Sequence, residues 1–362
     1  MKTIEQISEL FKNTKNTRSQ LIISGPCSAE TEEQVMQTAT ELKKLNKVHV
    51  FRAGIWKPRT LPGKFEGVGN VGLEWLRNVK NELHLPVTTE VATAKHVYEA
   101  LKFGIDILWI GARTTTTPFG VQEIADALKG TDIPVLIKNP ISPDMDLWIG
   151  AIERIKNAGL TKVGVIHRGF STWEKTKYRN NPHWQIAIEL KRRFPDLLMI
   201  CDPSHITGNK DLIYEVAQKS VDFNFGGLMI ESHINPCEAL SDKEQQLTPN
   251  ELNDIIERLH ISTENFGNIP VNQKITEIRG EIDLIDELLI DVLGKRMQLS
   301  EKIGMYKRDN KLSILQINRW NEIMQTRKDK AEKLGLSGNF IENIFKEIHI
   351  ESINIQAKVL NQ

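Results

Sequence analysis

The chain has 362 residues, a formal net charge of +0 and a hydrophobic share of 40%. The balanced charge argues against a broad nucleic-acid or membrane surface, and no apolar run approaches the roughly 18 residues of a membrane-spanning helix. The sequence has only 3 cysteines, an odd and sparse set that does not suggest a disulfide framework. We therefore expect a reduced, cytoplasmic protein with neither nucleic-acid nor membrane partners.

Short apolar runs, often rich in β-branched residues, recur eight times and are mostly separated by amphipathic helical patterns. They occupy residues 21–24, 48–51, 86–91, 107–111, 134–138, 163–167, 197–201 and 227–231. Such an alternation is typical of an α/β fold with a parallel (β/α)8 TIM barrel. Thr248, Pro249 and Glu251 form a capping-box signature for the start of the last barrel helix. The pattern predicts a barrel over residues 1–260.

The pattern changes after the barrel. Residues 261–272 are polar and contain glycine and proline, so we predict a linker there. Residues 273–362 lack strand patterns and predict a small all-α helical domain. Its first helix, running to about residue 309, would be roughly 50 Å long. One face of this helix carries aliphatic side chains at steps of three and four, namely Ile275, Ile278, Ile282, Ile285, Leu289 and Val292.

Two shorter helices are predicted over residues 318–333 and 339–359. So small a domain cannot bury the whole stripe of the long helix by itself, so we expect a homodimer through the helical domain. Gly280, Gly294 and Gly304 each cost about 1 kcal/mol inside a helix relative to alanine. We expect close helix contacts at these glycines.

Cations follow the strands of the predicted barrel. Functional groups of such barrels lie just past the carboxyl ends of the strands. Six candidates occur there: Arg52, Lys57, Arg59, Arg113, Lys138 and Arg168. Because guanidinium and ammonium groups bind phosphate and carboxylate, this set predicts a multiply anionic ligand.

A possible metal-binding set occupies the same strand ends. Cys27 follows the first strand, His205 the seventh, Glu231 ends the eighth, and Asp242 lies in the loop beyond. A thiolate, an imidazole and two carboxylates suit one divalent transition metal such as manganese, iron, cobalt or zinc better than magnesium or calcium. Such a metal would serve as a Lewis acid. Taken singly, each residue has an ordinary structural interpretation; their coincidence at one face of a barrel favours a site.

These residues lie in motifs that resemble those of 3-deoxy-D-arabino-heptulosonate 7-phosphate (DAHP) synthases of the short type I form. The motifs are GPCS (25–28), RAGIWKPRT (52–60), IGARTT (110–115), LIKN (136–139), HRG (167–169), DPSH (202–205), MIESH (229–233) and ALSDKEQQL (239–247). The resemblance implies condensation of phosphoenolpyruvate with D-erythrose 4-phosphate and release of phosphate. Octulosonate 8-phosphate synthases use arabinose 5-phosphate and carry a KANRS-type sequence where this chain has KPRT, which favours the four-carbon aldehyde.

The resemblance also implies roles for the strand-end residues. The metal ligands would be Cys27, His205, Glu231 and Asp242. Phosphoenolpyruvate would be bound by Arg52, Lys57, Arg113, Lys138 and Arg168. Erythrose 4-phosphate would lie near Arg59 and Thr60. Lys57 is a candidate proton donor to the aldehyde oxygen, and Glu90 a candidate to orient the attacking water.

Polar residues of the helical segment are spaced to share helix faces. Arg296 and Lys307 are eleven residues apart, about 20° past three full turns, and Ser352 and Gln356 are one turn apart. Arg279 lies about 100° away from the face of Arg296, so it could serve the pocket of a partner chain. Ordinary solvated charges remain the alternative for any one pair.

The separations of Arg279, Arg296, Lys307, Arg319, Ser352 and Gln356 resemble those of the all-helical chorismate mutases over residues 273–360. The resemblance implies conversion of chorismate to prephenate without a cofactor, in an intertwined dimer whose sites each take Arg279 from the other chain. Lys307 and Gln356 would bind the ether oxygen, and the arginines would bind the carboxylates. Gln316 and Trp320 stand where several members carry acidic residues that contact the ring hydroxyl; Gln316 can still donate and accept hydrogen bonds.

The sequence therefore predicts a bifunctional enzyme of aromatic amino-acid biosynthesis with feedback coupling between its parts. One alternative is that the helical tail is mainly an allosteric module that binds chorismate or prephenate. Another is a purely structural dimerisation bundle.

Overall fold

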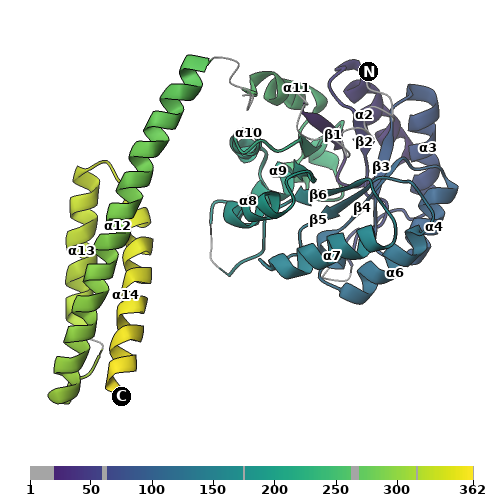
Figure 1. Ribbon diagram of the computed structural model, residues 1–362. Helices are drawn as coiled ribbons and strands as arrows, with labels where there is room; N and C mark the ends of the chain where they lie inside the picture. The colour runs from purple at the N-terminus through teal and green to yellow at the C-terminus, as the bar shows by residue number, and fades with distance from the viewer. Residues whose placement is uncertain (1–19, 59–62, 174–175, 262–268, 315–316, 362) are drawn as a thin grey trace. The chain divides into compact units, whose positions relative to one another are not determined.

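A computed structural model of the chain describes residues 20–58, 63–173, 176–261, 269–314 and 317–361. The chain divides into two compact units, Met1–Thr263 and Glu264–Gln362. The first unit is a barrel and the second consists of helices (Figure 1).

Eight parallel strands close the barrel in chain order, so the predicted (β/α)8 architecture is confirmed. The strands are β1 (Leu21–Gly25), β2 (Val50–Arg52), β3 (Val87–Val91), β4 (Ile107–Ile110), β5 (Val135–Lys138), β6 (Val163–His167), β7 (Leu198–Cys201) and β8 (Gly227–Glu231). The barrel closes where β1 pairs with β8, in a register that runs from Leu21 opposite Gly227 to Gly25 opposite Glu231. All strands therefore end at one rim.

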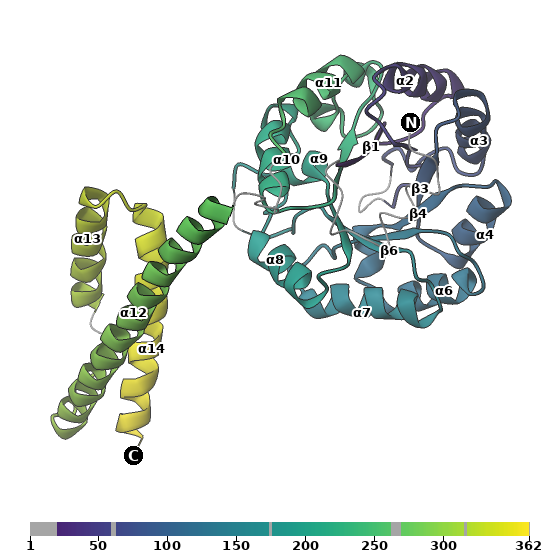
Figure 2. The same cartoon turned by 45° about the horizontal axis from the view of Figure 1, so that its top comes forward.

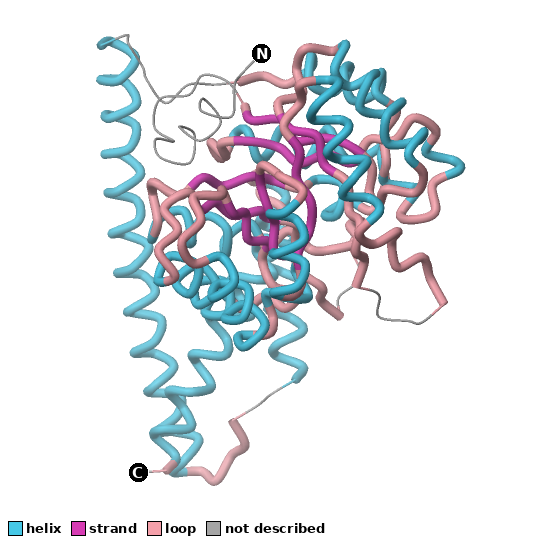
Figure 3. Tube along the Cα trace, turned by 90° about the vertical axis from the view of Figure 1, so that its right-hand side faces the viewer, coloured by secondary structure: helices cyan, strands magenta, loops and turns pink. Residues whose placement is uncertain are grey.

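Helices form a ring around the strands (Figure 2), and the strands lie inside this ring (Figure 3). The longer ones are α2 (Glu32–Lys44), α3 (Val71–Leu83), α4 (Ala94–Lys102), α6 (Pro118–Leu128), α7 (Met145–Asn157), α8 (Trp184–Arg193), α10 (Ile213–Asp222) and α11 (Pro249–Arg258). Two short helices, α5 (Ala112–Thr115) and α9 (Pro203–Thr207), directly follow β4 and β7. The capping box predicted at Thr248 is present at the start of α11. Among the described residues, no helix is both long and apolar enough to span a bilayer.

The inside of the barrel is packed with side chains. Successive residues of a strand point to opposite faces, so alternate positions fill the interior and the rest pack against the helices. The interior cluster consists of Leu21, Ile23, Val50, Ile107, Trp109, Leu136, Ile166, Leu198, Ile200 and Met229. This packed interior forms the floor beneath the rim at which the strands end.

The second unit contains α12 (Ile269–Asp309), α13 (Ile317–Lys333) and α14 (Gly338–Leu360). The helix α12 has 41 residues and begins inside the segment 261–272 that we expected to be a linker. The helix can begin this early because Pro270 lies in its first turn. The backbone N–H that proline lacks would have no partner within the helix at that position. Residues 262–268 lie outside the described part of the chain.

Both α12 and α13 pack against α14. A Cβ atom at Gly304 would lie 3.2 Å from the Cα of Gln356, so the expected close contact is present at this glycine. At Gly280 and Gly294, apart from neighbouring residues and the backbone of α12 itself, no atom of the described residues lies within 4 Å of such a Cβ. Those two glycines therefore do not mark close contacts within this unit.

Candidate active sites

The rim of the barrel brings together side chains that are far apart in the sequence. Arg52, Lys138 and Glu231 are the last residues of β2, β5 and β8, and Cys27 follows β1. All four are buried, with exposed fractions between 0% and 3%. Burial of so many ionisable groups is costly unless they are paired with one another or with a ligand.

The four candidate metal ligands form two neighbouring pairs. The Cys27 thiol donates to Asp242 Oδ2 over 3.3 Å, and His205 Nε2 lies 3.7 Å from Glu231 Oε1. Lys57 Nζ donates to Cys27 Sγ over 2.9 Å. Within the described ranges, no three His, Cys, Asp or Glu side chains converge closely enough to hold a metal as they stand.

The chemistry of this set is compatible with a divalent transition metal. Burial, followed by the charge of Glu231, raises the pKa of the Cys27 thiol to about 12, so the thiol is neutral without an added cation. Glu231 Oε1 is buried and accepts no hydrogen bond from the described residues, although Arg52 Nη2 lies 3.1 Å away in an ion pair. A divalent ion would favour the thiolate and use the open carboxylate oxygen.

Asp202 fixes the orientation of His205. Its Oδ1 lies 3.0 Å from His205 Nδ1, and its Oδ2 accepts from Lys138 Nζ over 2.8 Å. Burial opposes the charge of Asp202, but His205 and Lys138 hold the pKa of this carboxyl well below its usual value. Burial likewise lowers the pKa of His205, which favours the neutral imidazole. Neutral His205 with Nδ1 held by a carboxylate has the arrangement typical of metal-ligating histidines.

The buried guanidinium of Arg52 lies beside these groups, and two of its nitrogens lack a hydrogen-bond partner. Arg52 Nε and Nη1 have no hydrogen-bond partner among the described residues. The Arg52 guanidinium carbon lies 5.0 Å from the centroid of the Trp109 ring, and Lys138 Nζ lies 5.7 Å from the same ring. Trp109 Nε1 in turn donates to Glu90 Oε2 over 2.9 Å. Unpaired buried N–H groups of a cation indicate a site for an anion.

The sequence analysis overlooked Trp109. The sequence does give one indication of it. Trp109 is an aromatic residue two positions after Ile107, so both side chains of β4 face the barrel interior.

Two of the other predicted cations, Arg168 and Arg113, lie around this centre. Arg168 Nη1 donates to Asn180 Oδ1 over 2.8 Å, and burial lowers the pKa of Arg168 to about 10. Arg113 belongs to α5 and is exposed, and its positive charge contributes to lowering the pKa of Arg168. Arg59 and Thr60 lie outside the described residues.

Arg179 is a second residue that the sequence analysis missed. Its Nη1 donates to Asp242 Oδ1 and to Gln245 Oε1, both over 2.9 Å. Gln245 Nε2 donates onward to Glu231 Oε2 over 2.7 Å. Arg179 thus connects both candidate carboxylate ligands. A cavity of about 430 Å³ is bordered by Arg179, Asp242 and Gln245. Gly208 leaves room for the arginine, because a Cβ there would lie 2.6 Å from Arg179 Cβ.

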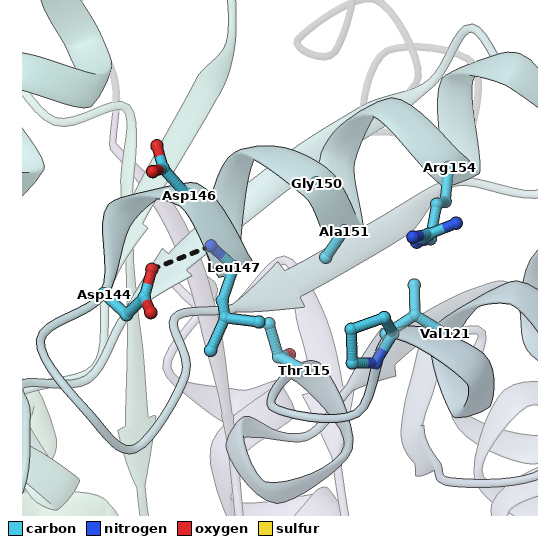
Figure 4. Close-up of a pocket in the computed structure, with 9 residues that line it drawn as sticks. Thr115, Val121, Asp144, Asp146, Leu147, Gly150, Ala151 and Arg154 are labelled. Carbon is cyan, nitrogen blue, oxygen red and sulfur yellow. Dashed lines mark hydrogen bonds between the residues drawn. The ribbon is translucent and has the colours of Figure 1, made fainter.

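Another cavity, of about 270 Å³, lies between α6 and α7 and is separate from this centre (Figure 4). Asp144 lines it and caps α7 by accepting from the Leu147 amide over 3.0 Å. Arg154 lines its other end and donates to Gln122 Oε1 over 3.1 Å. It shares no residue with the metal-ligand set.

The helical unit brings together four of its predicted site residues. Arg296 Nη1 on α12 donates to Ser352 Oγ on α14 over 2.5 Å, and Lys307 Nζ donates to the Ile314 carbonyl over 2.5 Å. Lys307, Ser352 and Gln356 are buried. Gln356 Oε1 has no partner among the described residues. A buried cation on α12 and an unpaired amide oxygen on the adjoining helix α14 indicate a polar, anion-binding pocket.

Of the other predicted residues, Arg279 does not join this pocket. Arg279 is exposed on α12 and lies about 25 Å from Arg296 along the helix axis, at 1.5 Å per residue. It therefore cannot serve the pocket of its own chain. Gln316 and the side chain of Arg319 lie outside the described part of the structure, although Arg319 belongs to α13.

Comparison with known families agrees with this geometry. Residues 6–266 match the DAHP synthetase I family. The chain belongs to this family. Residues 278–357 match the chorismate mutase type II family, so a chorismate mutase domain is fused behind the DAHP synthase barrel. Both are families of enzymes, and the chain therefore carries two enzyme domains.

Similar proteins include members of two aldolase groups. The chain is 34% identical over 226 residues to a phospho-2-dehydro-3-deoxyheptonate aldolase of Thermotoga maritima, a match covering 62% of this chain and 64% of the relative. The match thus spans less than two thirds of that relative's length. The chain is also 26% identical over 260 residues to a 2-dehydro-3-deoxyphosphooctonate aldolase of Desulfotalea psychrophila. This match covers 66% of this chain and 88% of the relative.

Solved structures of similar fold include the Thermotoga maritima DAHP synthase. It aligns with a TM-score of 0.60 at 30% identity and covers 67% of this chain and 68% of its own. A truncated form of the Thermotoga maritima enzyme aligns with a TM-score of 0.58 at 29% identity, covering 67% and 85%.

Proposed function

We propose that the barrel condenses phosphoenolpyruvate with D-erythrose 4-phosphate to give DAHP and phosphate, and that the helical domain converts chorismate to prephenate. The synthase assignment rests on the state of the Arg52 side chain. A buried guanidinium with two unpaired N–H groups lies at the rim beside a thiol, an imidazole and two carboxylates. This combination suits an anionic substrate next to a divalent metal.

The barrel residues have separate roles in the condensation. Cys27, His205, Glu231 and Asp242 would hold the metal, which supplies Lewis-acid polarisation of the aldehyde. Arg52, Lys138, Arg168 and Arg113 bind the phosphate and carboxylate of phosphoenolpyruvate. Arg59 and Thr60 bind the sugar phosphate.

Two further groups move protons. Burial opposes the charge of Lys57, but the Cys27 thiolate that a metal would favour and the Glu231 carboxylate raise its pKa. Lys57 is therefore protonated and can donate to the aldehyde oxygen as the carbon–carbon bond forms. Glu90, held by Trp109, orients the water that attacks the central carbon of the former enol.

We expect purified enzyme to use erythrose 4-phosphate and not arabinose 5-phosphate, because residues 57–60 read KPRT. A chelator should abolish this activity while leaving the chorismate rearrangement intact, and manganese, cobalt, iron or zinc should restore it. Phosphate release with each sugar, before and after metal removal, measures both points. Turnover of arabinose 5-phosphate would reassign the barrel, and loss of both activities on chelation would make the metal structural.

The helical domain needs only positioning and charge to promote its rearrangement. Lys307 and Gln356 bind the ether oxygen that gains negative charge as its bond breaks. Arg296, Arg319 and the partner's Arg279 bind the two carboxylates, and Ser352 holds Arg296 in place.

The exposed apolar surface of α12 supports the proposal of a homodimer. Side chains on this helix between 49% and 68% exposed are Ile282, Leu284, Ile285, Leu288, Leu289, Ile290, Val292, Leu299 and Ile303. A stripe of this extent on one helix is typical of a surface that a second chain covers. A partner would also supply Arg279 to the distant pocket.

An alternative is that the helical domain is mainly an allosteric module. Gln316 and Trp320 replace acidic residues of the resembled mutases, which favours binding with slow turnover. This alternative predicts that wild-type enzyme rearranges chorismate no faster than buffer, while prephenate or chorismate inhibits the synthase reaction. Feedback linkage is compatible with both assignments. We also propose a cytoplasmic enzyme, in keeping with its three free cysteines.

Arg179→Ala should weaken metal binding by the barrel about 10- to 100-fold, because Arg179 orients Asp242 directly and Glu231 through Gln245. Calorimetric titration of metal-free enzyme with manganese measures this affinity. Arg192→Ala removes an arginine whose partner, Glu189, is remote from the site, and should change nothing. Equal affinities of wild type and Arg179→Ala would remove Arg179 from the site.

A further inference from the structure

A buried ring nitrogen on α14 has no role in the functions described so far. His349 Nε2 is buried and has no hydrogen-bond partner among the described residues. The imidazole stacks on Trp320 of α13, with 4.1 Å between ring centroids and 19° between planes. The stack fixes the plane of the imidazole, and it leaves the hydrogen-bonding capacity of Nε2 unused. A buried polar atom in this state costs free energy unless a ligand pairs with it.

His349 shares a helix face with the residues of the candidate mutase pocket. Ser352 and Gln356 follow it by three and seven residues, which places all three side chains on one side of α14. Arg296, which contacts Ser352, also lies 3.5 Å from the carbonyl of Ile348. Gln356 Oε1 is a second buried atom without a partner on this face. Two unpaired polar atoms on the face of α14 that carries Ser352, the partner of Arg296, indicate that a polar ligand completes the pocket.

The charges around His349 restrict which ligand group it takes. Burial, followed by the positive charges of Arg296 and Lys307, lowers the pKa of His349, so the ring is neutral. Chorismate offers two carboxylates, an ether oxygen and one ring hydroxyl. The cations suit the anionic groups and the ether oxygen that gains negative charge. A neutral imidazole, whose nitrogens can donate or accept, suits the hydroxyl, which Trp320 cannot serve as an acceptor.

We propose that His349 binds the ring hydroxyl of chorismate and is a substrate-binding residue of the helical domain. This inference rests on the proposed mutase function of that domain. It identifies a contact for the one polar group of the substrate that the charged residues leave unpaired. The Trp320–His349 stack then takes the place of an acidic side chain in holding this group.

The test compares wild type and three variants on two substrates. His349→Ala should lower kcat/KM for chorismate about 10-fold, the value of one neutral hydrogen bond. On the chorismate analogue with hydrogen in place of the ring hydroxyl, His349→Ala and wild type should agree within about 2-fold, because the contact no longer exists. His349→Gln, which keeps a donor and an acceptor, should recover part of the loss on chorismate. Asn354→Ala, an exposed position of α14, is the matched control.

Two results would overturn the proposal, and they are distinguishable. An equal loss for His349→Ala on both substrates would show that the ring only packs against Trp320, with the mutase function intact. Wild-type enzyme that does not accelerate the rearrangement would remove the mutase function, and this contact with it. Far-UV circular dichroism of each variant establishes that the helices are folded during these measurements.

Discussion

Cys27→Ala should abolish metal binding by the barrel and lower kcat/KM of the synthase reaction about 10³-fold. A Lewis acid contributes several kcal/mol to such a reaction, and each 1.4 kcal/mol corresponds to about tenfold in rate. Cys27 supplies the only sulfur of the proposed ligand set, and it lies 3.3 Å from Asp242. Binding of cobalt gives a direct readout, because a cobalt–thiolate bond has a charge-transfer absorption that the alanine variant should lack.

The chain provides a matched control in Cys201. This cysteine is also fully buried, and it lies on β7 within the hydrophobic core. Cys201→Ala removes the same atom from an equally buried position and should retain both the cobalt absorption and the synthase activity. Chorismate turnover should be unchanged in both variants. A Cys27→Ala enzyme that keeps tight cobalt binding, or that loses mutase activity as well, would contradict the assignment of the thiol.

Lys307→Ala should lower kcat of the mutase about 10²- to 10³-fold and leave the synthase unchanged. The loss is that expected when one preorganised donor to a developing oxyanion is removed. Lys307 is 8% exposed, and burial lowers its pKa. Its charged form is the active one, so wild-type mutase activity should persist below that lowered pKa and decline as the pH rises through it, earlier than for an ordinary lysine. A coupled assay of prephenate formation across alkaline pH measures this.

Mixing variants tests whether two chains build each site. Lys307→Ala and Arg279→Ala dimers should each be nearly inactive. After subunit exchange, mixed dimers contain one doubly altered site and one intact site, so activity should return to about one quarter of wild type. Arg279 lies about 25 Å along α12 from Arg296, which is why it must act in the other chain. Failure of the mixture to regain activity would contradict the shared site.

Residue spacing was sufficient to predict the barrel and its rim. Once eight strands are assigned, closure of the barrel brings their ends together, regardless of the conformations of the loops. This is why Cys27, Arg52, Lys138 and Glu231 could be grouped from sequence alone. The start of α12 could not be predicted in the same way, because Pro270 is equally suited to a linker and to a first helical turn.

The contacts that the sequence does not reveal are those made by side chains across loops. Arg179 lies between β6 and α8 without any periodic pattern, and only the fold brings it to Asp242. Gln245 likewise acquires a role through its contact with Glu231. The pairing of Lys57 with the Cys27 thiol depends on how charges compensate one another in a buried space, which residue spacing does not encode.

Trp109 limits how this barrel can evolve. A single indole offers its face to two cations and its N–H to a carboxylate. Phenylalanine would keep the face and lose the donor, and an aliphatic residue would lose both. A neutral residue in the barrel interior is therefore expected to tolerate as little sequence drift as the charged groups that it supports.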